Sequence, residues 1–506
     1  MRGIYLNTNS ETLSRSIDFF AANNHIIKEQ FLGNDVVLIY SNQDWQHAPV
    51  VQLDDTCGGG KVYCAGWFIY NGQRNNLTEL ANDYISRGLA VFDEIVLGVF
   101  VFIHIDSNGS SAICDSIGVS THYGRSHEGQ LQVAPSVKAF NDPGPVNPLM
   151  KQIIASQGHL FGNLTAYDSI TRLDPGSKLS NDGSQDNYYA VNFNSPDKQQ
   201  LGDISQQIKE LIDYWPQPSR TLALSGGLDS RLTLAGQRFA YGYTYGPEHS
   251  ADRPIARQFA DCFERYNEFE FTEPEQLVEE EALSKDFYFG VSTWIPRLLT
   301  AYHYSFERAQ DSYVLFDGYL GDVFNRGNYM KFGGILGSLL KLCPWLYKLK
   351  LSAHFILKHR YKLLNEAAFK LLMTDFERRT AGLSADAYQK VTYYEVFYGR
   401  GARFTINGSN ITAGQMFTPI PFFLHRKVME MLLSQDFSDT VQYKLLGKIW
   451  SKVPSRFSEV ESDTGYSPMT PYWLTPIKNM FHQLLSHYIP GRGNYATGQP
   501  KVSKKE

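Results

Sequence analysis

The residues with the clearest chemical potential lie in the stretch Ser225-Gly-Gly-Leu-Asp-Ser230. Residues 221–224 before it read as a short buried strand, and residues 231–237 after it read as the start of a helix. Glycine lacks a Cβ, so Gly226 and Gly227 let backbone amides approach an anion closely, and the N-terminus of the following helix adds partial positive charge. This combination predicts a cradle for phosphate groups.

Asp229 narrows the chemistry of this loop. A carboxylate repels phosphate, so an aspartate here indicates that a cation such as Mg²⁺ bridges it to nucleotide oxygens. The chain has no G-x-x-x-x-G-K-[ST] motif, so this is not the common phosphate loop. The alternative is a Gly-Gly turn between a strand and a helix with no ligand at all.

The composition is that of an ordinary globular protein. Its 506 residues suggest two to four domains, and 43% hydrophobic with 20% charged residues gives ample material for large cores. The net charge of −5 lacks the basic excess of a nucleic-acid binder, so we expect no nucleic-acid partner. The five cysteines include no C-x-x-C pair, which indicates neither a disulfide framework nor a zinc site.

No stretch of the chain predicts a membrane crossing. The first residues lack the apolar core of a secretory signal, and no run of about 18 apolar residues occurs, so we expect a cytoplasmic protein with no transmembrane segment. Residues 331–364 carry seven Lys and Arg among leucines and Trp345. Such a stretch is typical of a solvated helix face, although it also suits a membrane surface or an anionic partner.

Residues 1–195 read as mostly β structure. Strand-like segments at 35–40, 61–64, 98–104 and 130–133 are separated by Asn, Gly and Asp clusters. One helix interrupts them from Asn76 onward, with Leu77, Leu80, Ala81 and Tyr84 on one face. We therefore expect antiparallel sheets in this region, and the polar residues 187–200 read as a linker.

Strands and helices alternate in the second region, residues 200–495. A helix over 204–214, the strand before the loop, a second strand at 241–245, a helix over 250–263 and a third strand at 314–317 follow in order. This alternation predicts a doubly wound parallel sheet with helical additions, and thus an α/β protein overall. Ligands of such sheets bind beyond the carboxyl ends of the strands, where the loop after Leu224 lies.

The loop resembles the pyrophosphatase loop, S-G-G-x-D-S, of N-type ATP-cleaving enzymes, which split ATP between its α and β phosphates. Residues 314–324 resemble the second motif of the same enzymes, S-G-x-G-x-D-E, with Gly318 and Asp322 matching and Val323 in place of the acidic residue. The resemblance implies adenylation rather than γ-phosphoryl transfer. An alternative for Asp322 is that it caps a following helix.

The first region is similar to the class II glutamine amidotransferase domain, a fold of the Ntn type, that precedes the synthetase domain in asparagine synthetases. The matches follow in order: Met1-Arg-Gly-Ile4, Tyr70-Asn71, Gly98-Val-Phe-Val-Phe102, Cys114-Asp-Ser-Ile-Gly-Val119, Tyr123-Gly124, Gly162-Asn-Leu-Thr165 and Arg172-Leu-Asp-Pro-Gly176. In that family a cysteine at position 2 is the nucleophile that releases ammonia from glutamine. Here Arg2 takes its place, and a guanidinium cannot attack an amide, so we expect a degenerate domain without glutaminase activity.

The resemblance implies a set of site residues in the second region. Lys444, in Lys444-Leu-Leu-Gly-Lys448, matches the lysine that contacts the phosphates, and we expect it to stabilise departing pyrophosphate, unless it is merely a surface lysine. Asp229 and Asp322 would hold Mg²⁺ and take part in catalysis. The residues implied in ATP binding are Leu224, Ser225, Gly226, Gly227, Asp229, Ser230, Thr244 and Gly318.

Taken over the whole chain, the resemblance implies a carbon–nitrogen ligase that adenylates a small-molecule or peptide carboxylate and forms an amide with an amine or ammonia. Leu424 and Phe417 stand where the family has an aspartate and a glutamate, which puts aspartate as the substrate in doubt. One alternative is an intramolecular cyclase of the β-lactam synthetase or lasso-peptide type. Another is a non-catalytic nucleotide-binding scaffold, and a homodimer is compatible with either.

Overall fold

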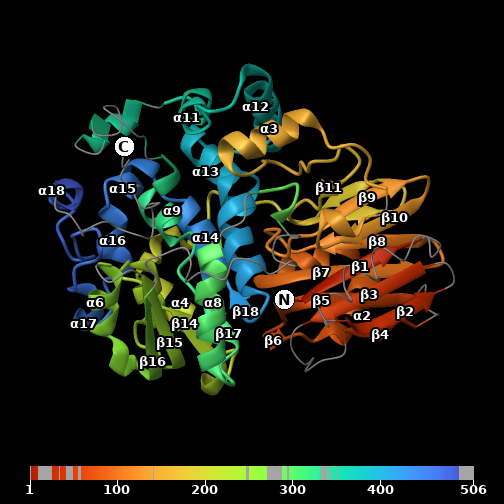
Figure 1. Cartoon of the computed structure of the whole chain (residues 1–506), viewed down its shortest axis with the longest axis horizontal. Coiled ribbons are helices and arrows are strands. Elements are labelled where there is room, and N and C mark those ends of the chain that lie inside the picture. The colour runs from red at the N-terminus through yellow and green to blue at the C-terminus, as the bar shows by residue number, and fades with distance from the viewer. Residues whose placement is uncertain are drawn as a thin grey trace, which may run out of the picture.

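The computed structural model describes residues 2–8, 26–32, 35–41, 49–54, 59–140, 142–246, 250–270, 288–292, 296–330, 332, 339–340, 343–349 and 351–488. Two antiparallel sheets form one end of the molecule, and a parallel sheet with its helices forms the other (Figure 1). This mixed α/β architecture confirms the fold class predicted from the sequence.

The first antiparallel sheet has the strand order β11-β9-β10-β1-β3-β2. Its strands are β1 (Arg2–Asn7), β2 (Ile26–Leu32), β3 (Asp35–Ser41), β9 (Tyr123–His127), β10 (Gln130–Ala134) and β11 (Thr171–Arg172). The N-terminal strand β1 is central, paired with β3 on one side and with β10 on the other.

The second antiparallel sheet has the order β13-β12-β8-β7-β5-β4, with β6 beside β5. Its strands are β4 (Val50–Gln52), β5 (Lys61–Tyr70), β6 (Gln73–Arg74), β7 (Leu97–Asp106), β8 (Gly109–Cys114), β12 (Ser177–Ser180) and β13 (Gln185–Asn187). Alternate residues of the two sheets, such as Ile4, Ile39, Tyr63 and Val101, meet in one buried cluster. Burial of every second side chain is what holds two such sheets face to face.

The helix predicted in this region is α2 (Leu77–Arg87). The side chain of Asn76 caps it by accepting a hydrogen bond from the Glu79 amide, and Leu77, Leu80, Ala81 and Tyr84 are its buried residues. The predicted apolar face is thus confirmed residue by residue. A second helix, α3 (Pro148–Gln157), follows later in this region.

The parallel sheet has the order β16-β15-β14-β17-β18, and every neighbouring pair is parallel. Its strands are β14 (Arg220–Ala223), β15 (Phe239–Gly246), β16 (Phe263–Glu270), β17 (Val314–Phe316) and β18 (Thr418–Ile420). Helices α4 (Ile204–Ile212), α5 (Asp229–Leu234), α6 (Asp252–Arg257) and α8 (Pro296–Ala309) alternate with these strands along the chain.

The helix predicted over 250–263 is shorter than expected. It ends at Arg257, and Phe263 is instead the first residue of β16. A Cβ on Gly242 of β15 would lie 2.3 Å from the Phe263 ring, so the ring occupies the space that this glycine leaves open. Packing across the sheet therefore overrides the helical spacing of Ala256, Phe259 and Phe263.

The remaining helices lie towards the C-terminal end of the chain. They are α9 (Gly321–Arg326), the 3₁₀ helix η11 (Pro344–Leu349), α11 (Ala353–Arg360), α12 (Glu366–Thr380), α13 (Ala387–Phe397), α14 (Arg426–Leu433), α15 (Phe437–Val441), α16 (Lys444–Ile449), α17 (Ser455–Ser458) and α18 (Thr475–Tyr488). Within the described residues, no helix is both long and apolar enough to span a bilayer.

Polar and aromatic contacts join the two ends of the molecule. The buried Arg172 donates 2.9 Å and 2.5 Å hydrogen bonds to the carbonyls of Phe397 and Gly118. The rings of Trp67 and Trp215 meet edge to face, 5.2 Å apart. The contacts of Arg172 with Phe397 and of Trp67 with Trp215 each join a residue of the first region to a residue of the second. The two regions therefore share one hydrophobic core.

Candidate active site

The phosphate loop predicted from the sequence lies at the carboxyl edge of the parallel sheet. It follows β14, the central strand, and leads directly into α5 at Asp229. From β14 the chain adds β15 and then β16 on one side, before β17 joins on the other side. The loop therefore lies where the direction of strand addition reverses, which is the usual ligand position in such sheets.

Hydrogen bonds fix the shape of this loop. The Ser225 and Ser230 hydroxyl oxygens lie 3.0 Å apart, and the Ser225 amide donates to Ser230 Oγ at 3.1 Å. The Gly227 amide donates to Ser225 Oγ at 3.2 Å, and the Gly226 amide donates to Asp252 Oδ1 at 2.7 Å. All three of these loop amides therefore have a hydrogen-bond partner within the protein in this structure.

Asp229 is a largely buried carboxylate beside two donors. Its Oδ2 lies 2.6 Å from Arg326 Nη2, and its Oδ1 accepts a 3.2 Å hydrogen bond from Asn325 Nδ2. Burial raises the pKa of Asp229 to about 6, with Arg326 opposing the rise and the charges of Asp322 and Asp463 adding to it. The group is thus held among charges of both signs.

The second predicted motif packs directly against the first. A Cβ on Gly318 would lie 2.6 Å from the Ser230 amide nitrogen, and one on Gly321 would lie 2.5 Å from Asp229 Cγ. Leu320 between them has a φ of 66°, a conformation unusual for a residue with a branched side chain. Two glycines are therefore needed for this turn to approach the start of α5.

Asp322 lies in the first turn of α9, where its carboxylate accepts a hydrogen bond from Asn328 Nδ2. Leu320, and not Asp322, occupies the N-cap position, so the capping alternative for Asp322 is wrong. Its charge reaches Asp229 strongly enough to raise the pKa of that carboxyl. Within the described residues, no three His, Cys, Asp or Glu side chains are close enough to hold a metal ion by themselves.

Three residues that the sequence did not single out surround the loop. The fully buried Arg231 donates to the carbonyls of Val460 at 2.5 Å and Gly226 at 3.1 Å, and burial lowers its pKa to about 10. The Asp463 amide donates to the Gly226 carbonyl at 3.1 Å. Arg231 and the Asp463 amide thus hold the segment before α18 against the loop, while Asp252 binds the Gly226 amide. Of the three residues, only Arg231 could be noticed in the sequence, because it directly follows the motif.

Asp317 is the most strongly buried carboxyl group at this edge of the sheet. It directly follows β17, and its Oδ1 accepts a 2.9 Å hydrogen bond from the Tyr319 amide. Its Oδ2 is buried without a hydrogen-bond partner in the part of the chain that the structure describes. Burial raises the pKa of Asp317 to about 7, and the nearby phenols of Tyr302 and Tyr319 are hydrogen-bonded to each other at 3.0 Å.

Lys444 begins α16, as the sequence pattern suggested, but it does not touch the loop here. Its Nζ forms a 2.8 Å ion pair with Asp439 and lies 5.7 Å from the centre of the Tyr472 ring. An aromatic chain links this helix to the loop, because the rings of Tyr443 and Tyr466 are 5.4 Å apart and Arg326 Nη1 lies 3.4 Å from Tyr466 Oη.

Leu224 and Thr244, both expected at the nucleotide, bond to each other. The Thr244 hydroxyl donates to the Leu224 carbonyl at 2.6 Å and accepts a 2.8 Å hydrogen bond from Tyr266. Thr244 is buried on β15. In this arrangement its side chain ties the loop to the neighbouring strand.

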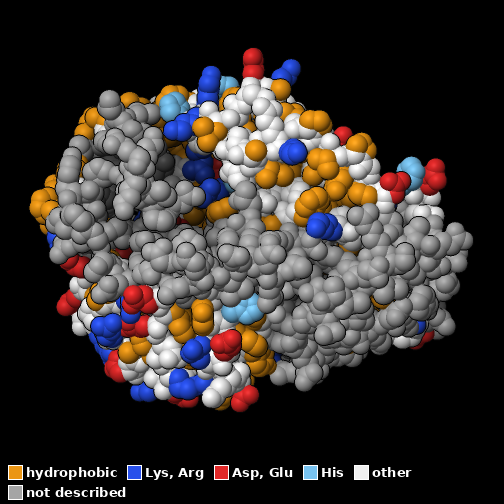
Figure 2. Space-filling model, viewed as in Figure 1, with side chains coloured by type: hydrophobic (Ala, Val, Ile, Leu, Met, Phe, Trp, Pro, Cys, Tyr) orange, Lys and Arg blue, Asp and Glu red, His pale blue; other side chains and the backbone are white. Residues whose placement is uncertain are grey.

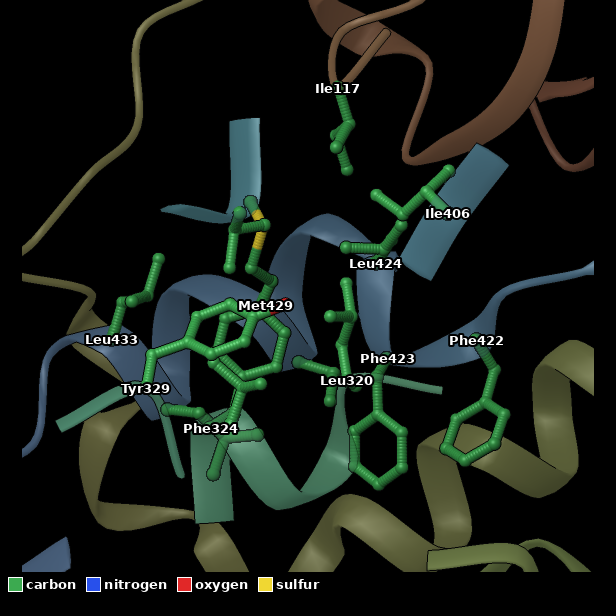
Figure 3. Packing of buried hydrophobic residues seen from close by; sticks show 14 of the residues in the cluster. Ile117, Leu320, Phe324, Tyr329, Ile406, Phe422, Phe423, Leu424, Met429 and Leu433 are labelled. Atoms are coloured by element: carbon green, nitrogen blue, oxygen red, sulfur yellow. The ribbon is translucent and has the colours of Figure 1, made fainter. Parts of the chain in front are cut away.

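Phe417 and Leu424, where the sequence differs from the motifs that it resembles, are both core residues. Phe417 is buried with its ring 5.1 Å from that of Phe306. Leu424 is fully buried, and Figure 3 shows it next to Ile406 and below Ile117 of the first region. A carboxylate at either position would face apolar side chains, so the surroundings of both residues suit the apolar side chains that are present.

Arg2, at the position of the family's nucleophile, begins the central strand β1 opposite Ser41. Its side chain and Met1 lie outside the described residues. Two residues on, the Ile4 amide donates to the buried His122 Nε2 at 3.2 Å. Desolvation lowers the pKa of His122 to about 4, so this ring is a neutral structural acceptor near neutral pH.

The sequence matches no protein-family model, and no curated protein matches it. Among solved structures, it is similar to glutamine phosphoribosylpyrophosphate (PRPP) amidotransferase from B. subtilis complexed with ADP and GMP. The identity is 9%, the match covers 63% of this chain and 81% of that chain, and the TM-score is 0.23.

Proposed function

We propose that this chain is an ATP-dependent ligase of the asparagine synthetase type, which adenylates a carboxylate and then forms an amide with an amine or ammonia. The observation that carries the proposal is the close approach of two turns at the carboxyl edge of the parallel sheet. Gly318 and Gly321 of one turn leave no room for a Cβ against Asp229 and Ser230 of the other. Two motifs far apart in sequence thus converge at the expected ligand position.

In this proposal the loop residues Ser225, Gly226, Gly227 and Ser230 bind the phosphates, while Asp229 and Asp322 hold Mg²⁺. The donor set fits this ion, because Mg²⁺ is usually held by one or two carboxylates together with phosphate oxygens and water. The charges of Asp322 and Asp463 add to the rise in the pKa of Asp229, and a divalent cation bound at Asp229 would relieve this repulsion. When bound, Mg²⁺ would offset the negative charge of the phosphates.

To bind phosphate, the backbone amides of the loop must give up the hydrogen-bond acceptors that they have in this structure. The Gly226 amide would leave Asp252, and the Gly227 amide would leave Ser225 Oγ. Burial and the charge of Asp463 raise the pKa of Asp252 to about 6, which favours its neutral form more than is usual for an aspartate. An anion in the loop would add to that preference.

We assign to Asp317 the transfer of a proton from the attacking amine. A general base works best when its pKa is near the working pH, and the pKa of Asp317 is about 7. Its Oδ2 is buried and has no hydrogen-bond partner within the described residues, so this oxygen would accept the proton once the amine is bound beside it. Asp317→Asn should keep adenylation and lose most amide formation, whereas loss of both steps would contradict this role.

The decisive experiment measures exchange of labelled pyrophosphate into ATP with the wild-type chain, screened over candidate carboxylates. Phosphorus NMR of the active mixture then identifies the products. We expect AMP and pyrophosphate, and no exchange for Asp229→Asn. Formation of ADP and inorganic phosphate without AMP would overturn adenylation.

One observation favours a second candidate, a non-catalytic nucleotide-binding scaffold. Arg326 places a guanidinium 2.6 Å from Asp229, where it supplies positive charge that Mg²⁺ would otherwise provide. A scaffold of this kind would bind ATP equally well with and without Mg²⁺. The ligase should bind ATP tightly only when Mg²⁺ is present, so a titration in EDTA separates the two candidates.

A further inference from the structure

The charges of this chain are distributed unevenly. Residues 323–365 contain eight Lys and Arg and no Asp or Glu, and residues 464–505 contain five Lys and Arg and no Asp or Glu. Together these two stretches hold 13 of the 47 basic residues and none of the 52 acidic ones. The rest of the chain is therefore strongly acidic, and these stretches are its basic parts.

The same two stretches carry most of the exposed apolar side chains. In the described part of the chain, twelve large hydrophobic residues are exposed, and ten of them belong to these stretches. They are Leu339, Trp345, Leu349, Leu363, Met469, Tyr472, Trp473, Ile477, Phe481 and Leu484. Leu349 is 72% exposed and Trp473 is 63% exposed. Basic residues and exposed apolar side chains thus occur in the same two stretches of the sequence.

The helix α18 turns its apolar face outward. Ile477, Phe481 and Leu484 follow helical spacing on one side and are all exposed. The other side holds the helix to the protein, because Asn479 Nδ2 lies 3.4 Å from Tyr443 Oη and Lys478 forms a 2.6 Å ion pair with Glu461. A helix of a globular protein normally buries its apolar face, so α18 has the reverse orientation.

The two stretches lie at the same end of the molecule. The 3₁₀ helix η11 packs on α15 through the rings of Tyr347 and Phe437, 5.5 Å apart, and α18 packs on the start of α16. Since α15 and α16 are consecutive, η11 and α18 flank one pair of helices. Figure 2 shows hydrophobic side chains at the edge where Figure 1 places α18, and basic and His side chains over α11.

Two carboxylates of α15 and its N-cap lie beside these elements. Asp436 caps α15 by accepting a 2.7 Å hydrogen bond from the Ser438 amide, and Asp439 is paired with Lys444 at 2.8 Å. The charge of Lys348 acts on Asp436 and helps to lower the pKa of that carboxyl, whereas Lys358 and Lys362 are exposed on or just after α11.

We propose that this end of the molecule docks on the surface of an anionic lipid bilayer. The docking surface consists of Trp345, Leu349, Trp473, Ile477, Phe481 and Leu484, with the exposed lysines around it. Exposed Trp, Phe and Leu beside Lys and Arg are typical of elements that lie in the bilayer interface, and anionic headgroups attract the basic residues. A second copy of this chain is less suited, because a symmetric contact would bring two basic surfaces together.

Docking would place the membrane near the candidate active site. The segment between α17 and α18 crosses the loop, where the Asp463 amide donates to the Gly226 carbonyl at 3.1 Å, and Glu461 of this segment pairs with α18. The docking proposal does not depend on ligase activity, because it is argued only from the exposed apolar and basic side chains of the docking surface.

The test is co-sedimentation of the full chain with vesicles of phosphatidylcholine, with and without phosphatidylglycerol. We expect binding only to the anionic vesicles and weaker binding at high salt. The double variant Ile477→Ser/Phe481→Ser should bind about tenfold more weakly, because apolar area is lost. Lys358→Glu and Lys362→Glu should each weaken binding about fivefold or more, since each lysine near such a surface contributes about 1 kcal/mol.

Matched changes outside the docking surface serve as controls. Val146→Ser removes an exposed apolar side chain, and Lys151→Glu reverses an exposed charge on α3, so both variants should bind like the wild type. Circular dichroism checks that each variant is folded. Absence of vesicle binding, equal binding to neutral vesicles, or self-association that Phe481→Ser abolishes without any vesicle binding would each overturn the proposal.

Discussion

Asp229 and Arg326 form a buried ion pair, with Oδ2 and Nη2 only 2.6 Å apart. The side chains are 14% and 10% exposed, so water screens the pair poorly. Asp229 begins α5 and Arg326 ends α9. The pair therefore joins the two helices that follow the two glycine-rich turns of the candidate active site.

Arg326→Met should destabilise the fold. It leaves the Asp229 carboxylate buried without its cation, a loss that typically costs about 3–5 kcal/mol. We expect urea unfolding at neutral pH to show a decrease of this size. The double variant Arg326→Met/Asp229→Asn should be more stable than Arg326→Met alone, because it removes the unpaired charge as well. Additive losses would show that the two side chains do not interact.

Asp229→Asn and Asp322→Asn should each weaken the binding of Mg·ATP by about tenfold, because each removes an anionic oxygen while keeping the shape of the side chain. Isothermal titration measures the affinity. Asp168→Asn, which alters an exposed carboxylate of the first region, serves as the matched control. Unchanged affinity in both site variants would rule out the proposed Mg²⁺ site.

Asp317 should make stability depend on pH. Its pKa is about 7 in the folded protein against 3.8 for the free side chain, so below pH 4 both states are protonated and the group has no effect. Between pH 4 and 7 only the unfolded chain releases the proton, so the wild type loses stability as the pH rises. Asp317→Asn should match the wild type at pH 4 and exceed it above pH 7, by at most on the order of 4 kcal/mol. Urea unfolding of both proteins over this range tests the difference, and a constant difference at all pH values would contradict it.

Lys444→Ala should lower turnover far more than it weakens ATP binding. Negative charge accumulates on pyrophosphate as it departs, so a fixed ammonium there is worth most in the transition state. Loss of such a donor typically costs about a hundredfold in rate. Because Nζ is paired with Asp439 here, Asp439→Asn is the informative companion variant and should retain activity. Equal losses of binding and turnover in Lys444→Ala would contradict the role given to this lysine.

Glutamine should not be hydrolysed by this chain. Arg2 cannot act as the nucleophile, because its guanidinium stays protonated and has no lone pair available for attack. An assay of glutamate release should give the buffer value for both the wild type and Arg2→Cys. Activity of the wild type would refute the prediction, whereas activity of Arg2→Cys alone would show that the remaining pocket is intact.

The sequence by itself determined several local elements of this protein. The apolar face of α2 follows from spacing within one helix, and the turn after β14 follows from two adjacent glycines. The sequence also predicted the glycine-rich turn after β17, since Gly318 and Asp322 have the spacing of the S-G-x-G-x-D-E motif that this segment resembles. Each of these predictions depends on residues only a few positions apart. The regular backbone geometry of a helix, strand or turn then determines where their side chains lie.

Only the tertiary structure decided which of these elements meet. The pairing of Asp229 with Arg326 and the contact of Asp463 with Gly226 each span a long stretch of chain and depend on the strand order of the parallel sheet. The outward apolar face of α18 is likewise visible only once its opposite face is seen to hold Tyr443 and Glu461. The early end of α6 has the same origin, because Phe263 fills the space beside Gly242 on a neighbouring strand. Burial and charge pairing act between elements, so hydrophobic periodicity along the chain cannot specify them.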